Sequence, residues 1–195
     1  MVMKRICAVC SILVFAAGCT EETPRSFNNL TAADTGIHFR NQLQESPELN
    51  ILTYLYYYNG AGVLIEDFNN DTLPDIYFGG NQTEDALYLN RGDMKFEEVT
   101  HKAGISNGSG WTTGISHVDI NGDGLQDLYV CKASGYRSLE GRNLLYLNLG
   151  VDSDGIPKFE EQAAAYGLDF SGLSTQAAFF DYDLEGDLDL FRLKH

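Results

Sequence analysis

Short runs of alternating apolar and polar residues recur along the chain from about residue 62 onward. They are rich in Val, Ile, Tyr and Phe, and each is bounded by Gly, Asn or Asp. Runs of this kind are typical of β-strands joined by turns. Beyond the N-terminal segment, no stretch keeps the apolar period of roughly 3.6 residues that marks an amphipathic helix. The pattern predicts an all-β protein with strands in GVLIEDF (62–68), DIYFGG (75–80), GISHVDI (114–120), DLYVCK (127–132) and DLFRL (189–193).

The same landmarks return along the chain in a fixed order. The acidic segments DFNNDTLPD, DINGDGLQD and DYDLEGDLD begin at residues 67, 119 and 181. ALYLNRG (86–92) returns as LLYLNLG (144–150), and KFEEVTHKAGI (95–105) returns as KFEEQAAAYGL (158–168). A period of about fifty to sixty residues with about four strands per unit is typical of a β-propeller blade. The sequence therefore predicts a partial β-propeller over residues 33–195, with about two blades and the start of a third.

Each acidic segment carries oxygen-bearing side chains at its first, third, fifth and ninth positions. On a curling loop the first three converge, a glycine at the sixth position permits a sharp turn, and the seventh position can offer its backbone carbonyl. This donor set suits Ca²⁺, which takes about six to eight oxygen ligands, better than Mg²⁺, which usually keeps several waters. Zinc would call for Cys or His, and neither occurs in these segments.

The acidic segments also resemble two other kinds of loop. An EF-hand needs Glu at the twelfth position between two helices, but that position holds Phe78, Val130 and Arg192, and the flanks are strand-like. The EF-hand is therefore excluded. Asp and Asn also form Asx turns without any metal, and this alternative stays open. Three segments with the same ligand spacing favour calcium.

The pattern D-x-[DN]-x-D-G-x-x-D between strands, repeated at blade spacing, resembles the FG-GAP or VCBS repeats of integrin α-subunit propellers. More narrowly, NGAGVLIEDFNNDTLPDIYFGG followed by LYLNRG and KFEEVTHKAGI resembles bacterial relatives of the cartilage acidic protein, which often carry an ASPIC/UnbV segment. The resemblance covers about residues 33–195. It implies a calcium-stabilised propeller, often in an outer-membrane lipoprotein.

The resemblance also implies a set of calcium ligands. Thr72 departs from the pattern because it stands where the glycine is expected, and Glu185 departs from it by one extra methylene. Three residues, Leu73, Leu125 and Asp187, would contribute backbone carbonyls. The implied ligands are Asp67, Asn69, Asp71, Leu73 and Asp75; Asp119, Asn121, Asp123, Leu125 and Asp127; and Asp181, Asp183, Glu185, Asp187 and Asp189.

The N-terminal segment is typical of an export signal. Lys4 and Arg5 precede an apolar run at residues 6–17, which is shorter than the roughly 20 residues of a membrane-spanning helix. AAGC at residues 16–19 resembles the lipobox of bacterial lipoproteins, where cleavage precedes a cysteine that is then acylated. We expect a signal peptide at 1–18, a lipid on Cys19 and a polar tether at 19–32, which would place the protein in the bacterial outer membrane at the cell surface. The alternative is an ordinary secretory signal.

Composition narrows the possible partners and chemistry. The formal net charge is −15, and nucleic-acid binding requires Lys and Arg, so nucleic acid is excluded as a partner. Cys7 and Cys10 fall in the expected signal peptide, which leaves Cys131 and the lipidated Cys19, so no intrachain disulfide is expected. The sequence holds no G-x-S-x-G, H-E-x-x-H or phosphate-loop motif, and it nominates no catalytic residue.

Three further expectations concern single segments. Trp111 should begin a strand and lie in the core, and His117 should lie in a strand in a packed or surface role. TYLYYYNGAG (53–62) should form a strand with alternate tyrosines packed inward before an Asn59–Gly60 turn. A sugar-stacking platform is the alternative for this run.

The leading hypothesis is a non-catalytic, surface-anchored calcium-binding repeat protein that serves adhesion or ligand binding, with a protein or glycan partner. The alternative is a fragment of a polysaccharide-active enzyme on a propeller scaffold. Because the sequence stops one strand after the third acidic segment, we expect an incomplete propeller.

Overall fold

The computed structural model describes residues 27–106 and 110–194. The chain divides into two units, residues 1–30 and 31–195, and all the strands lie in the second. The signal peptide expected at 1–18 and the lipidated Cys19 lie outside the described residues. Within the described residues, no helix combines the length and the hydrophobicity needed to cross a membrane.

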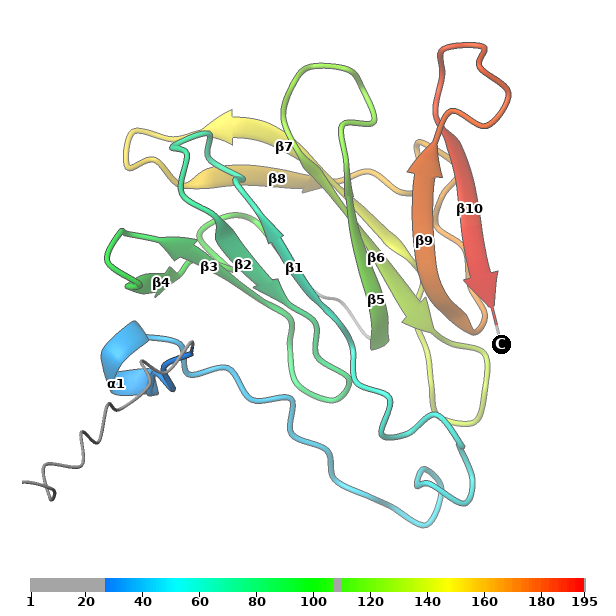
Figure 1. Ribbon diagram of the computed structural model, residues 1–195. Coiled ribbons are helices and arrows are strands. Elements are labelled where there is room, and N and C mark those ends of the chain that lie inside the picture. The colour runs from blue at the N-terminus through cyan, green and yellow to red at the C-terminus, as the bar shows by residue number, and fades with distance from the viewer. Residues whose placement is uncertain (1–26, 107–109, 195) are drawn as a thin grey trace, which may run out of the picture. The chain divides into compact units, whose positions relative to one another are not determined.

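The second unit is built from three antiparallel sheets, in which strands adjacent in sequence are adjacent in space (Figure 1). The first sheet contains β1 (Val63–Glu66), β2 (Asp75–Phe78), β3 (Ala86–Asn90) and β4 (Phe96–Glu98). The second contains β5 (Trp111–Val118), β6 (Asp127–Ala133), β7 (Leu144–Val151) and β8 (Pro157–Glu161). The third contains β9 (Ser174–Phe180) and β10 (Asp189–Lys194). The all-β prediction and the strands predicted around the acidic segments are thereby confirmed.

Each acidic segment joins the first strand of a sheet to the second. The pairs that flank the three loops are Glu66 with Asp75, Val118 with Asp127, and Phe180 with Asp189. All three loops project from the same end of the sheets, the upper end in Figure 1. The loops between the second and third strands lie at the opposite end, because the strands are antiparallel.

The second sheet is the centre of the core because both of its faces are covered. Successive residues of a strand point to opposite faces. Leu128 and Val130 of β6 therefore pack among the side chains shared with the first sheet, whereas Tyr129 and Cys131 pack with Ala177 of the third. Every residue of β6 is buried. Each large apolar side chain buried in this way contributes about 1.5–3 kcal/mol.

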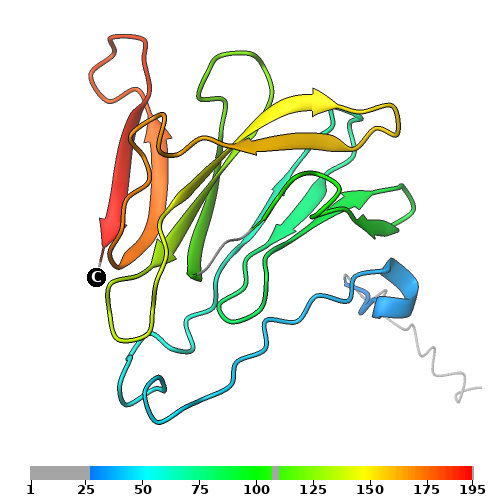
Figure 2. The same cartoon turned by 180° about the vertical axis from the view of Figure 1, so that it is seen from behind.

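Strands β1, β5 and β9, the first of each sheet, follow one another across the unit. β5 contacts both β1 and β9, and the view from behind in Figure 2 shows the sheets fanning out from these strands. Side chains tie β5 to β9: Ser116 donates a hydrogen bond to the carbonyl of Ala177, and Thr113 donates one to the carbonyl of Ser174.

One short helix, α1 (Ala32–Thr35), precedes the sheets. This helix was not predicted, because four residues are too few to show an apolar period. A capping box encodes it: Thr31 accepts a hydrogen bond from the Asp34 amide, and Asp34 accepts one from the Thr31 amide. Gly36 ends it with φ 82°, a conformation that favours glycine.

The strand predicted for the tyrosine-rich run is wrong, because residues 51–58 form successive turns. The amide of Tyr57 donates to the carbonyl of Tyr54, so these two rings lie on one side at a spacing of three residues and both are buried. They pack on Trp111 with ring centroids 5.9 and 5.2 Å away. Trp111 itself is 2% exposed, as predicted for a core residue.

Candidate metal centre

The second acidic loop is folded around the carboxylate of its first residue. Asp119 accepts hydrogen bonds from the backbone amides of Asp123 at 3.0 Å and Gly124 at 2.9 Å. Asp123 in turn accepts one from the amide of Leu125 at 2.8 Å. Gly124 has φ 84°, which the tight turn requires. The side chains at the first and fifth positions thus turn inward over the loop backbone.

The first acidic loop repeats this network. Asp67 accepts from the amides of Asp71 at 3.1 Å and Thr72 at 2.8 Å, and Asp71 accepts from Leu73 at 2.8 Å. Thr72 keeps the turn of the glycine that it replaces, with φ 71°. A β-branched residue is rarely found in this left-handed region, so the first loop carries backbone strain that the second avoids.

The asparagines at the third position form Asx turns in both loops. The side-chain oxygens of Asn69 and Asn121 accept the amides of Asp71 and Asp123, at 3.2 and 3.1 Å. Their amide nitrogens donate to a carboxylate oxygen of the same two aspartates. The Asx turns, which are the alternative to metal binding, are therefore present. They leave acceptor lone pairs on each carboxylate, so they are compatible with a bound cation as well.

The carboxylates at the ninth position are buried and connect strands. Asp75 accepts from the amides of Phe68 at 3.0 Å and Asn90 at 2.8 Å. Asp127 accepts from Ile120 at 3.0 Å and Asn148 at 2.7 Å. Burial raises the pKa of Asp75 to about 6, opposed by the two backbone hydrogen bonds, and it also raises the pKa of Asp127. A cation beside either carboxylate would favour its charged form.

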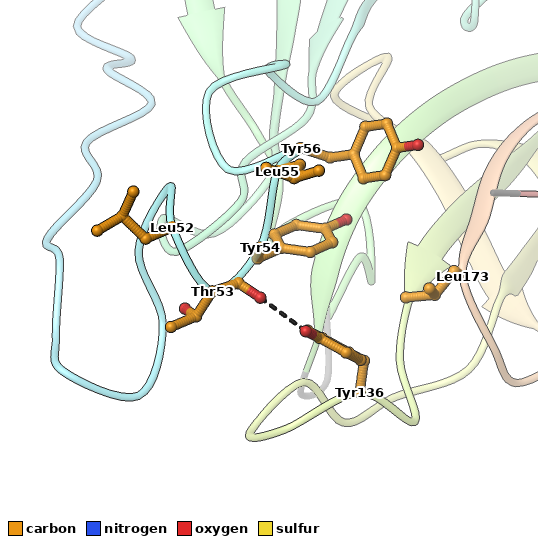
Figure 3. Close-up of a pocket in the computed structure, with 7 residues that line it drawn as sticks. All are labelled: Leu52, Thr53, Tyr54, Leu55, Tyr56, Tyr136 and Leu173. Atoms are coloured by element: carbon orange, nitrogen blue, oxygen red, sulfur yellow. Dashed lines mark hydrogen bonds between the residues drawn. The ribbon is translucent and has the colours of Figure 1, made fainter.

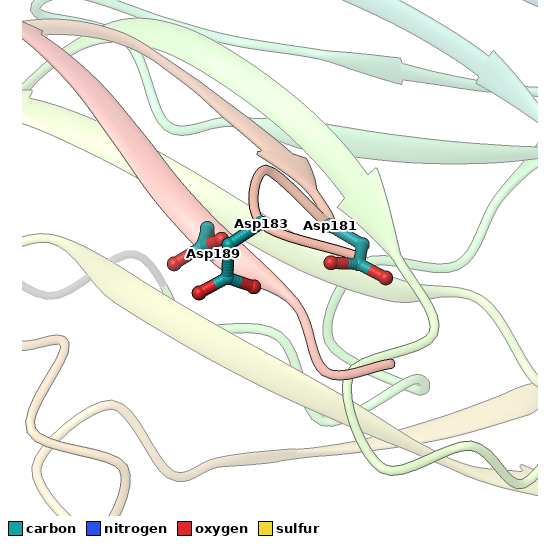
Figure 4. Close-up of side chains that lie close together, drawn as sticks. All are labelled: Asp181, Asp183 and Asp189. Carbon is teal, nitrogen blue, oxygen red and sulfur yellow. The ribbon is translucent and has the colours of Figure 1, made fainter. Parts of the chain in front are cut away.

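The third acidic loop brings three carboxylates together, as Figure 4 shows for Asp181, Asp183 and Asp189. One oxygen from each lies within 4.8 Å of the others. Within residues 27–106 and 110–194, this is the one grouping of three acidic, His or Cys ligand atoms at such short range. Glu185 and Asp187 are exposed and lie outside the grouping.

One oxygen in this third loop has no partner. Oδ2 of Asp181 accepts from the amide of Gly186 at 3.0 Å, whereas its Oδ1 is buried and makes no hydrogen bond. In the other two loops the fifth-position amide donates both to the first-position carboxylate and to the third-position side chain. In the third loop the Glu185 amide donates to Asp183, at 3.3 Å, and not to Asp181. A buried oxygen without a donor costs about 1–3 kcal/mol. A hard cation would satisfy it and offset the repulsion among the three carboxylates, so the residues present fit Ca²⁺.

Two asparagines that the sequence pattern did not single out hold the loops in place. Asn148 ends the LYLN motif, and its Nδ2 donates to the carbonyls of Gln126 at 3.3 Å and Phe68 at 2.9 Å. It thereby links the second loop to the first. Asn90 donates to the carbonyl of Pro74 at 3.0 Å. The repetition of LYLN-x-G was the available signal, since a buried polar residue kept at the same place in two repeats needs a bonding partner.

His117 lies in β5, as predicted, and does not face the carboxylates of its own loop. Its Nδ1 lies 2.8 Å from the side-chain oxygen of Gln126 and 3.1 Å from a carboxylate oxygen of Glu66 on β1. Its role is therefore to link the first two sheets beside their acidic loops.

A hollow of about 400 Å³ lies at the other end of the sheets, away from the acidic loops. Figure 3 shows its lining, in which the hydroxyl of Tyr136 donates to the carbonyl of Thr53 at 2.7 Å. The lining is uncharged and mostly apolar, and it includes the highly exposed Leu52 and Leu55. The lining residues are Leu52, Thr53, Tyr54, Leu55, Tyr56, Tyr136 and Leu173.

Comparison with protein families agrees with the loop geometry. Residues 67–130 match the FG-GAP-like repeat family. The match begins at the first residue of the first acidic loop, includes the whole second loop and ends within β6. The predicted resemblance to FG-GAP repeats is therefore confirmed for this segment. No curated protein sequence matches the chain.

Proposed function

We propose that the protein is a non-catalytic calcium-binding repeat protein of the cell surface, in which sheets of a β-propeller serve adhesion or ligand binding. The observation that carries the proposal is the third acidic loop, where three carboxylates converge and an oxygen of Asp181 is buried without a partner. The FG-GAP-like repeat at 67–130 and the repeated loop networks support the same function for the first two loops.

In this proposal calcium acts on stability and on the shape of the loop end, not on a reaction. Side-chain oxygens at the first, third, fifth and ninth positions and the carbonyl at the seventh would hold the ion. Neutralising the acids of the loops would fix three adjacent loops on one end of the sheets. A fixed set of neighbouring loops on a rigid scaffold is the usual platform for binding another molecule.

Calorimetric titration and thermal melting test the proposal. Sites with dissociation constants of about 10⁻⁴ to 10⁻³ M would each add roughly 0.4–1.4 kcal/mol at about 1 mM Ca²⁺. We expect heat of binding on Ca²⁺ addition and a melting temperature that falls when EDTA is added. Asp181→Asn should weaken both effects, whereas Glu160→Gln, on the exposed side of β8, should leave them unchanged. Equal melting temperatures with Ca²⁺ and with EDTA would reject calcium binding.

Surface anchoring rests on AAGC at 16–19 and has its own test. Cells given an alkyne fatty acid should incorporate the label into the wild type and not into Cys19→Ala, and the variant should leave the membrane fraction. Separation of inner from outer membranes then locates the protein. A mature N-terminus at a residue other than Cys19 would overturn the anchor and leave the calcium proposal untouched.

A further inference from the structure

Three buried polar side chains cross the boundary between the first and second sheets. Asp85 precedes β3 in the first sheet, whereas Thr112 and Lys132 belong to β5 and β6 of the second. The ammonium of Lys132 donates to the hydroxyl of Thr112 at 3.1 Å, and that hydroxyl donates to Oδ1 of Asp85 at 2.8 Å. The three residues are 2%, 0% and 1% exposed.

The carboxylate of Asp85 accepts hydrogen bonds both from its own sheet and from the second sheet. Locally, it accepts from the amide of Gly80 at 2.7 Å and from the hydroxyl of Tyr77 at 3.0 Å. The corresponding residue of the second sheet is Asn143, which accepts from the amide of Lys132 at 2.9 Å and donates to the hydroxyl of Tyr129 at 2.9 Å. A neutral amide is thus sufficient for the local task. What the carboxylate adds in the first sheet is the acceptor for Thr112.

The first sheet cannot supply the other half of this contact. Lys132 corresponds to Gly80, where a Cβ atom would lie 2.0 Å from the carbonyl oxygen of Thr83, so no side chain fits there. Thr112 corresponds to Gly60, which has no hydroxyl. The first sheet therefore offers the acid, and the second offers the hydroxyl and the cation.

The boundary between the second and third sheets uses different chemistry. Ser174 of β9 corresponds to Thr112 and accepts from the guanidinium of Arg192 at 3.0 Å. That guanidinium lies over the ring of Phe170, 4.2 Å from its centroid, and the acid is replaced by the neutral Asn143. The two boundaries are therefore chemically distinct although the sheets are repeats of one another.

The burial of the contact argues against a reaction site. A hydroxyl between an amine and a carboxylate is also how a nucleophile is activated, but these three groups are closed to solvent. An uncompensated charge at such depth is strongly unfavourable, whereas the completed contact costs little. Packing against a sheet without the hydroxyl and the cation would leave the Asp85 carboxylate buried and unpaired, and is therefore unfavourable.

We infer that the face of the first sheet around Asp85 is an interaction surface that selects a sheet carrying a hydroxyl backed by a cation. This buried contact disfavours the stacking of one first sheet on another in the same arrangement, because the copy would place Gly60 and Gly80 opposite Asp85 and would supply neither a hydroxyl nor a cation.

A double-mutant cycle tests the energetic part. Asp85→Asn and Lys132→Met should each lower the melting temperature by roughly 10 °C, and Thr112→Val should do the same. The variant with both charges removed should melt within about 3 °C of the wild type, because no unpaired charge remains. Additive losses in the double variant would overturn the inference. The exposed pair Arg91–Glu97, joined at 2.8 Å, is the matched control, and its cycle should show little coupling.

Refolding at high protein concentration tests the selection itself. The double variant keeps its stability but loses the discrimination, so size-exclusion chromatography after refolding should show several times more persistent oligomer than before unfolding. The wild type and the Arg91→Met/Glu97→Gln control should return to their starting profiles. A double variant that also returns to its starting profile would show that the contact stabilises the boundary without selecting the partner.

Discussion

The second and third acidic loops carry the same ligand spacing in different surroundings. In the second loop, Asp127 is fully buried and accepts a hydrogen bond from the amide of Asn148 in β7, the third strand of the sheet. In the third loop, Asp189 is exposed; its Oδ2 accepts the Tyr182 amide, and the described part of the third sheet contains only β9 and β10. In the second loop, backbone amides hold the carboxylate of Asp119. In the third loop, three carboxylates lie close together and one oxygen of Asp181 has no hydrogen-bond partner.

The difference between the two loops shows that the third strand of a sheet can supply hydrogen bonds that stabilise the acidic loop, as a bound ion would. Asn148 supplies its amide to Asp127 and bonds the carbonyls around it, which positions the loop without any metal. Within residues 27–106 and 110–194, the hydrogen bonds to the carboxylates at the first, third and ninth positions of the third loop come from the loop's own backbone amides. A cation should therefore change the third loop more than the second.

The largest effect is expected when the side chain of Asn148, which links the third strand to the second loop, is removed. Asn148→Ala leaves the carbonyls of Phe68 and Gln126 and the amide of Gly150 without their partner. We expect a loss of about 3 kcal/mol in the free energy of unfolding, measured by urea titration. Asn90→Ala in the first sheet should cost less, because Asn90 makes no contact equivalent to the one with Phe68. Equal losses would show that the link between the two loops contributes nothing.

Tyr129→Phe makes the second sheet resemble the third, where the corresponding residue is Phe191. Burial raises the pKa of Tyr129 to about 12. Because the folded-state pKa lies above the unfolded value of about 10, this group contributes stability that is complete below pH 10 and lost as the pH rises toward 12.

The Tyr129→Phe variant should be about 1–2 kcal/mol less stable than the wild type at pH 8, because Leu168 and Asn143 lose a partner. The difference should shrink or reverse by about pH 11.5. Denaturant midpoints across this range measure it. If the difference in stability between the variant and the wild type does not change with pH, the loss of stability at alkaline pH arises from other tyrosines.

Exchanging the third-position residues tests the role of charge directly. Asp183→Asn gives the third loop the residue that the other two have, Asn69 and Asn121. Because calcium affinity depends on the charge of the ligands, we expect the Ca²⁺-dependent part of the stability to fall by about 1 kcal/mol. The reverse change, Asn121→Asp, should strengthen Ca²⁺ binding to the second loop. Calorimetry of both variants decides it, and unchanged affinities would place the ion elsewhere.

The smallest expected effect concerns the first loop. Thr72→Gly restores the glycine that stands at the same position in the other loops, Gly124 and Gly186, where φ is 84° and 92°. Relief of the strained φ of 71° outweighs the extra entropy of glycine in the unfolded chain, so a gain of about 0.5 kcal/mol is expected. Gly124→Thr should destabilise the second loop by more than this. Chemical denaturation of the two variants provides the comparison.

Much of the fold could be predicted because its signals are local. Alternation of apolar residues with bounding Gly and Asn placed the strands around the acidic loops, and the repeated landmarks gave the correspondence between sheets. The strand predicted for the tyrosine-rich run was wrong, because aromatic residues at consecutive positions are compatible with both a strand and a series of turns. Only the packing of Tyr54 and Tyr57 on Trp111 selected the turns.

The candidate site divides in the same way. Spacing alone located the three loops, since the side chains that cap a tight loop must lie at alternate positions of that loop. The roles of Asn90 and Asn148 required knowledge of which strand lies beside each loop, and the contact of Asp85 with Thr112 joins residues from different sheets.

The sequence by itself determined the strands, the repeat and the positions of the acidic residues, because each depends on neighbours along the chain. Only the tertiary structure decided which acids are buried, which are held by a third strand and which converge. These properties depend on desolvation and on hydrogen-bond donors that come from distant segments. Asp119 and Asp181 hold the same position in two loops with identical ligand spacing. Both carboxylate oxygens of Asp119 accept hydrogen bonds, whereas one oxygen of Asp181 has no partner.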